Sequence, residues 1–176
     1  MLLNELTALK KASELVTIVL DSCTDQLTGI IHTTNNRVTA LVLYCEEGEY
    51  QGWTFFETDQ INEIYWGDRE HRAIASLIDN NLQRVLPIKN NATFSSCVVE
   101  LGRRLECVGL YTFREEEGFD LVKIVDFSSE WLKVMAYGTK STLSSGWKII
   151  PREEVCRIEI DSPYINKTAQ LHKSGL

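Results

Sequence analysis

The residues able to carry out chemistry are few and scattered along this chain. The three histidines, His32, His71 and His172, share no ligand spacing with a cysteine or a carboxylate, which predicts surface or strand-end positions for them. The acidic run 115–117 precedes Gly118 and is more typical of a solvated turn than of a cation site. The sequence has no phosphate-binding glycine loop, nucleophile elbow or dinucleotide fingerprint. We therefore predict a non-catalytic protein with no cofactor and no metal; the alternative is an unrecognised enzyme with its site between two halves.

The cysteines favour a reducing compartment. There are 5 of them, they are spread widely, and no pair has the CxxC spacing of a zinc or redox site. Three lie beside Val or Ile, as small buried apolar residues do: Cys97, Cys107 and Cys156. Neither a disulfide framework nor a zinc site is expected, and the cytoplasm is the predicted location.

The N-terminus and the hydropathy pattern predict neither export nor a membrane span. Glu5 comes early and Lys10 and Lys11 come late, the reverse of the charge order in a secretory signal. No apolar run approaches the roughly 18 residues that a membrane-spanning helix needs. The composition, with 44% hydrophobic and 24% charged residues, is that of a globular chain with a core.

Charge is unevenly distributed between the two halves. Residues 1–88 contain 6 Lys plus Arg against 13 Asp plus Glu, whereas residues 89–176 contain 12 of each. Proteins that bind polyanions usually present a basic face. The acidic first half therefore disfavours nucleic acid as a partner.

Tryptophans are the main candidates for binding. Trp53 and Trp147 each follow a glycine at the entrance to an expected strand, and the interpretation we favour for both is core packing or closure of a barrel. Ligand stacking is the alternative. Trp66 and Trp131 have no matching tryptophan elsewhere in the chain, which favours a surface that meets a partner.

An internal repeat organises the chain. Shifted by 94 residues, 52–77 aligns without a gap on 146–171, and the apolar positions match better than the identities do. With one residue added, 37–44 aligns on 130–137, and 13–20 resembles 105–112. The same elements recur in the same order over about 75 residues, which indicates duplication. Chance similarity of amphipathic strands is the alternative.

Each copy predicts a short helix followed by about five short strands. The helices are indicated by apolar stripes in 2–12 and 94–105. The strands of the first copy are expected at 16–20, 28–33, 38–44, 52–57 and 61–66. After the last strand, 74–86 has helical spacing but 164–171 suits a closing strand, so we expect a strand to about Asp79. The predicted domains are 1–80 and 92–176, joined by a linker at 81–91.

This element order resembles the Sm-like class of SH3-like small barrels. Five short strands with tight turns suggest a sheet that curls on itself. The resemblance implies a mainly β fold of two tandem five-stranded barrels, each preceded by a short helix. It also implies RNA binding through two loops, one with an acidic residue shortly before an asparagine and one with Arg-Gly.

The loops keep only part of that pattern. Residues 33–37 keep asparagines without the acidic residue, and 66–68 keep the glycine but have Trp66 in place of the arginine. The corresponding loops at 127–130 and 160–162 keep neither feature. Fold similarity alone does not fix function.

We therefore expect a non-catalytic interaction or scaffold protein that binds a protein partner or itself, since small barrels leave strand edges to be covered. The alternative is a protein that binds RNA or another single-stranded nucleic acid in the manner of the Sm-like class. Under either hypothesis the expected contact residues are Asn35, Asn36, Trp66 and Trp131.

Overall fold

The computed structural model describes residues 1–176 except 22–24, 80–87, 89–91, 114–118, 138–144 and 175–176. The predicted linker at 81–91 lies outside the described residues, apart from Ile88, and so does the acidic run 115–117. The helices are α1 (Leu2–Ala12), α2 (Arg69–Leu77), α3 (Phe94–Arg104) and α4 (Pro163–Lys173). The strands are β1 (Leu15–Leu20), β2 (Gln26–Thr34), β3 (Thr39–Tyr44), β4 (Tyr50–Phe56), β5 (Ile61–Trp66), β6 (Val108–Thr112), β7 (Asp120–Phe127), β8 (Trp131–Tyr137), β9 (Gly146–Pro151) and β10 (Val155–Ile160).

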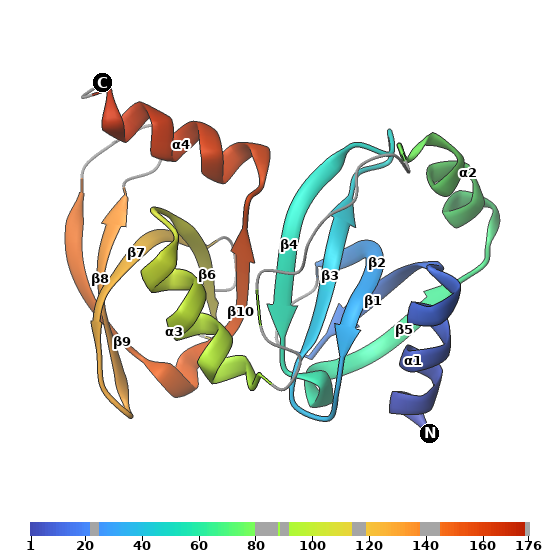
Figure 1. The fold of residues 1–176 in the computed structure, drawn as a ribbon, viewed down its shortest axis with the longest axis horizontal. Helices are drawn as coiled ribbons and strands as arrows, with labels where there is room; N and C mark the ends of the chain where they lie inside the picture. The colour runs from blue at the N-terminus through green and yellow to red at the C-terminus, as the bar shows by residue number, and fades with distance from the viewer. Residues whose placement is uncertain (22–24, 80–87, 89–91, 114–118, 138–144, 175–176) are drawn as a thin grey trace. The chain divides into compact units, whose positions relative to one another are not determined.

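The chain divides into two compact units, Met1–Phe94 and Ser95–Leu176. Unit 1 contains strands β1 to β5 and unit 2 contains β6 to β10 (Figure 1). A 3₁₀ turn precedes the last strand of each unit, at Thr58–Gln60 and Arg152–Glu154. The protein is thus mainly β, as the sequence predicts.

The five strands of each unit are arranged in the same order. In unit 1 the neighbours run β5-β1-β2-β3-β4, and in unit 2 they run β10-β6-β7-β8-β9. Adjacent strands within a unit are antiparallel, as expected for strands joined by short turns. The last strand of each unit therefore returns to lie beside the first.

The registers of these pairs also agree between the units. Val16 lies opposite Gly29 in β1–β2, and the residues at the corresponding positions, Val108 and Val122, lie opposite each other in β6–β7. The same holds farther along each sheet, where the pair Leu43↔Gly52 corresponds to Ala136↔Gly146. A register shift of one residue would turn every side chain of a strand to the other face of the sheet. Because the registers agree, corresponding side chains of the two units point to corresponding faces.

Two β-bulges recur at corresponding places. One lies between Ile31 and Thr33 in β2, and its counterpart lies between Ile124 and Asp126 in β7. The second shifts the β1–β5 register beside Leu20, and an equivalent shift occurs in β6–β10 beside Val155. A bulge bends its strand and increases the local twist. The sheets of both units are therefore bent at the same two points.

The two N-terminal helices lie where apolar stripes predict them. In unit 1 Leu6 and Leu9 of α1 are buried against residues of β1, β2, β3 and β4. The helix ends at Ser13, which has a left-handed backbone with φ 51° and donates its N–H to the Lys10 carbonyl. In unit 2 Leu101 of α3 is fully buried. Each of these helices thus contributes to the core of the unit.

The segments after β5 and β10 correct one prediction. The expected strand up to Asp79 and the expected closing strand at 164–171 are both wrong, because these segments form helices α2 and α4. The side chains of Asp68 and Ser162 cap the helices by accepting hydrogen bonds from the backbone N–H groups of His71 and Ile165. Pro163 then begins α4 at a position where no backbone donor is needed.

Both C-terminal helices cover one end of a sheet face. Ile74 of α2 packs with Leu15, and the half-buried Tyr44 packs against them. In unit 2 Ile165 of α4 packs with Cys107, Leu121 and Tyr137. The ring of Tyr137 also meets the ring of His172 edge to face, with centroids 4.5 Å apart.

Candidate interaction surface

The β2–β3 loop, where the predicted contact residues Asn35 and Asn36 lie, is held by the Asn35 side chain. Its Oδ1 accepts hydrogen bonds from the backbone N–H groups of Arg37 and Val38 at 2.7 and 3.0 Å, and its Nδ2 donates to the Ala92 carbonyl at 3.4 Å. Asn35 is therefore engaged in shaping its own turn, whereas Asn36 is exposed.

Unit 2 builds the corresponding β7–β8 loop with a serine. Ser128 Oγ accepts from the backbone N–H groups of Glu130 and Trp131 at 3.2 and 3.1 Å, and the Ser128 N–H donates to the Trp131 carbonyl. Different residues thus satisfy the same backbone groups in the two loops. The asparagine at 35 has a structural role that serine can also fulfil.

The structure does not bring the predicted contact residues of unit 1 together. Trp66 ends β5 and is 40% exposed. It lies opposite Val16, which in turn lies opposite Gly29 on β2. Asn35 follows Gly29 by six residues, about 20 Å along an extended strand. Trp66 and the asparagines are therefore separate features of unit 1.

Trp131, by contrast, belongs to a group of exposed side chains in unit 2. It begins β8, where burial alternates: Trp131 and Lys133 are exposed, while Leu132 and Val134 are fully buried. On β9 Trp147 and Ile149 face the same way, since Met135 lies opposite Trp147 and Lys133 lies opposite Ile149. We call Trp131, Lys133, Trp147 and Ile149 the β8–β9 face.

The β8–β9 face is strongly exposed and apolar. The exposed fractions are 46% for Trp131, 64% for Trp147 and 67% for Ile149. Helix α4 covers the other end of the same side of β8, where Met135 packs against the cluster around Tyr137. The apolar surface is thus a continuation of a core cluster beyond the end of the helix that covers it.

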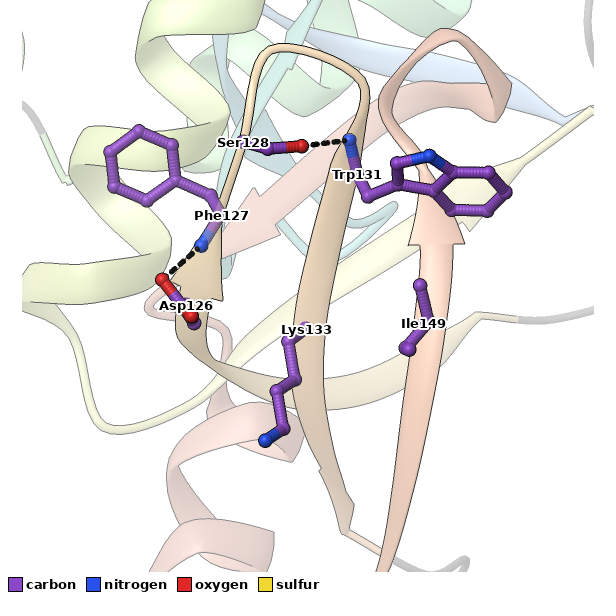
Figure 2. A pocket seen from close by; sticks show the side chains of 6 residues that line it. All are labelled: Asp126, Phe127, Ser128, Trp131, Lys133 and Ile149. Carbon is purple, nitrogen blue, oxygen red and sulfur yellow. Dashed lines mark hydrogen bonds between the residues drawn. The ribbon is translucent and has the colours of Figure 1, made fainter.

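A shallow hollow of about 490 Å³ borders this face (Figure 2). Trp131, Lys133 and Ile149 line it from two adjacent strands, and Phe127 and Asp126 line it from the end of β7. The Asp126 carboxylate accepts the Phe127 N–H at 2.8 Å, which fixes the end of β7. The hollow therefore has a mostly apolar lining, and a hydrogen bond holds the end of β7 at its border.

Cations lie over the aromatic rings around the hollow. Lys133 Nζ is 5.1 Å from the centroid of the Trp147 ring, and Arg103 Cζ of α3 is 5.3 Å from that of Phe127. Arg152 donates to the Ser128 carbonyl at 2.7 Å and also bonds the Ser95 hydroxyl. Aromatic residues together with Arg are the types enriched where proteins meet.

The corresponding positions in unit 1 are buried. Trp147 corresponds to Trp53, which is 4% exposed and packs its ring against His32 at 4.9 Å. Ile149 corresponds to Phe55, and Trp131 to Val38, with exposed fractions of 0% and 1%. The prediction of core packing therefore holds for Trp53 and is wrong for Trp147. Equal backbone positions have opposite environments in the two units.

A sequence signal for this difference exists. In unit 1 the stretch 38–44 is apolar on both faces, which is typical of a strand buried on both sides. In unit 2 the otherwise apolar stretch 131–137 contains Lys133, and a charged residue within a strand indicates that its side of the strand faces solvent. The shared Gly-Trp dipeptide suggests the same environment for Trp53 and Trp147, whereas the residues of the neighbouring strands differ.

A second arrangement, in unit 1, has the order of a hydrolase triad. His71 Nδ1 donates to the Asp68 carboxylate at 2.8 Å, and Nε2 is 3.0 Å from the Thr17 hydroxyl. Thr17 and His71 are each only 4% exposed, and Thr17 also bonds the Thr28 hydroxyl at 2.9 Å. Because the hydroxyl is enclosed, we interpret the three residues as a tie between α2 and β1.

The thiols of unit 2 are enclosed as well. Burial raises the pKa of Cys97 and of Cys107 to about 12, so neither forms a thiolate near neutral pH. Cys156 is also buried. Within the described part of the chain, no group of three or more His, Cys, Asp or Glu side chains is placed to hold a metal ion.

No helix of the described residues is long and apolar enough to cross a membrane. Comparison with known proteins identified no matching family model, no matching curated protein and no matching solved structure.

Proposed function

We propose that this chain is a non-catalytic interaction protein that binds a protein partner through the β8–β9 face. The observation that carries the proposal is the contrast in exposure between Trp147 and Ile149 and their buried counterparts Trp53 and Phe55. A monomeric protein rarely leaves a contiguous group of large apolar residues in water without a use for it. A partner that covers these residues would restore the burial seen in unit 1.

We further propose that the two units are copies of one small barrel of the SH3-like, Sm-like type. Support comes from the shared strand order, the shared registers and the two recurrent bulges. In each unit the last strand pairs with the first, which brings the end of the unit beside its beginning. Duplication followed by divergence would leave one unit with an apolar face open for binding.

Binding of single-stranded nucleic acid has less support. The Asn35 side chain is engaged in its own loop. The hollow and the neighbouring one beside α3 are lined by the carboxylates of Asp126 and Glu100 as well as by the cations Lys133, Arg103, Arg104 and Arg152. A nucleic-acid groove instead combines aromatic rings with a consistently positive wall. A titration with oligonucleotides at low salt tests this alternative, because binding to phosphates weakens steeply as salt rises.

The test of the proposed function compares three forms of the chain as bait in quantitative affinity capture. They are the wild type, the face variant Trp147→Ser/Ile149→Thr, and a control, Leu77→Ser, that removes an exposed apolar residue of α2. We expect at least one protein to bind the wild type and the control but not the face variant. That protein must then form the same complex when both components are purified. Capture that is unchanged by the face variant contradicts the proposal.

A further inference from the structure

The strand that carries half of the β8–β9 face is also an edge strand. Among the described residues of unit 2, β9 pairs with β8 only. An edge strand presents unpaired N–H and C=O groups that can hydrogen-bond another strand. The apolar side chains and the free backbone edge therefore belong to the same six-residue segment.

The direction of the free backbone groups follows from the hairpin. The Arg152 N–H donates to the Glu130 carbonyl at 2.8 Å, so this pair is hydrogen-bonded. Because hydrogen-bonded and non-hydrogen-bonded pairs alternate in an antiparallel ladder, Ile150 and Lys148 direct their backbone groups toward β8. Trp147 and Ile149 direct theirs to the open edge.

The edge carries few of the features that normally prevent pairing. In β5, the outer strand beside β1 in unit 1, Asn62 and Glu63 are exposed. In β9 the single charged residue is Lys148, and Asp120 neutralises it through contacts of 2.6 and 2.7 Å to Nζ. Charges, prolines and bulges are the usual guards of an edge. In β9, Lys148 is held by Asp120, Pro151 lies only at the end of the strand, and no bulge interrupts the pairing with β8.

We infer that β9 pairs with β9 of a second copy of this chain, antiparallel across a two-fold axis that passes beside Ile149. This inference rests on the proposed function and names the partner. Unit 2 carries 11 Lys plus Arg against 12 Asp plus Glu, so two copies meet with little net repulsion. Unit 1, with 7 against 13, would resist the same approach.

The register follows from charge and chain chemistry. Residues opposite each other in a sheet point to the same face, so the axis passes beside a residue and not between two. An axis at Lys148 would place two lysines directly opposite each other, which is destabilising. An axis at Ile149 instead places Ile149 opposite its own copy and Trp147 opposite Pro151, whose carbonyl accepts from the Trp147 N–H but which has no N–H to donate to the Trp147 carbonyl. The closed two-fold pairing limits assembly to a dimer.

The experiment measures association of the full chain by sedimentation velocity across the micromolar range. The wild type is expected to show a reversible monomer–dimer equilibrium. Ile149→Lys and Ile149→Glu, each alone, are expected to be monomeric, because the substitution places like charges opposite each other. An equimolar mixture of the two variants is expected to recover the dimer. Circular dichroism and the urea midpoint of each variant verify that it is folded.

Three results overturn the inference: a wild type that remains monomeric throughout the range, variants that dimerise as well as the wild type, or a mixture that fails to dimerise while both variants are folded. Assembly that grows beyond a dimer overturns the two-fold pairing and points to a head-to-tail contact. A monomeric wild type whose capture of another protein still depends on the β8–β9 face contradicts this inference alone. If neither dimer formation nor the capture of another protein depends on the β8–β9 face, the proposed function is contradicted as well.

Discussion

Trp53 and Trp147 occupy the same position in their two units, yet one is buried and the other is exposed. Each follows a glycine in the fourth strand, and each lies opposite the corresponding residue of the third strand, Val42 or Met135. Their exposed fractions are 4% and 64%. The position in the sheet is therefore set by the backbone, while the environment depends on what covers the face.

This contrast predicts different energetic effects of the same substitution. Trp53→Ala is expected to lower the free energy of unfolding by about 3–5 kcal/mol, as removal of a buried aromatic side chain does. Trp147→Ala removes an exposed ring and one contact with Lys133, so a loss of less than about 1 kcal/mol is expected. Urea unfolding at low protein concentration measures both. Equal losses would mean that the two environments are not different.

Two glycines in contrasting surroundings, Gly29 and Gly146, predict different effects of an added methyl group. A Cβ on Gly29 would lie 2.3 Å from the Val42 carbonyl oxygen, a backbone atom that a rotamer change cannot move. Gly29→Ala is therefore expected to destabilise unit 1 by about 1–3 kcal/mol. Gly146 has open space around it, so Gly146→Ala is expected to change stability by no more than about 0.5 kcal/mol. Urea unfolding distinguishes the two, and a neutral Gly29→Ala would contradict the close approach of β2 and β3.

The cysteines predict a pattern of thiol reactivity. Cys97 and Cys107 have a pKa of about 12 because they are buried, and Cys156 is enclosed as well. In a Cys23→Ser background, the half-buried Cys45 is expected to be the thiol that reacts with a chromogenic disulfide at pH 8. All four are expected to react in denaturant. Rapid reaction of a second thiol in the native protein would show that unit 2 is more open than described.

The carboxylate of Glu106 predicts a pH dependence of stability. The hydrogen bond from Lys123, 3.3 Å away, lowers the pKa of Glu106 in the folded protein. A lowered folded pKa stabilises the fold above the pKa of the unfolded chain, and this contribution is lost as the pH falls through the folded pKa. Because the pair is largely exposed, its effect should stay below about 1 kcal/mol.

The comparison of wild type with Glu106→Gln tests that sign. The thermal midpoint of the variant is expected to be lower at pH 7, and the difference is expected to shrink as the solution is acidified below the ordinary range of a glutamate. Lys123→Met should show the same trend, since it removes the other partner. A difference that grows in acid would contradict the assignment.

The strands and their order were predictable because short-range signals agree with the tertiary structure. Turn residues separate alternating apolar stretches, and the strand 61–66 expected from the sequence coincides with β5. The helices after β5 and β10 were missed even though their signals were present. Asp68 and the Ser162-Pro163 pair are typical helix starts, whereas the apolar residues of 164–171 also fit a strand.

The candidate surface was predictable only in part. Trp131 was identified because it lacks a counterpart in the other half, and it proved to lie on the β8–β9 face. The prediction that Trp147 is buried is wrong, because its similarity to Trp53 suggested the same environment for both. Burial of a strand residue depends on elements remote in sequence, so a local pattern cannot assign it. The charge of Lys133 within an otherwise apolar strand was the one local signal that favoured exposure.

The equal registers of the two units also allow strand mispairing during folding, because β10 could pair with β1 in place of β5. Differences between the first strands oppose such an exchange. Thr17 of β1 bonds His71 of its own unit, whereas the residue at the corresponding position of β6 is Gly109, where the Phe119 ring would lie 2.8 Å from an added Cβ. The first strand of each unit thus differs at this position, which favours pairing with the last strand of its own unit over the corresponding strand of the other unit.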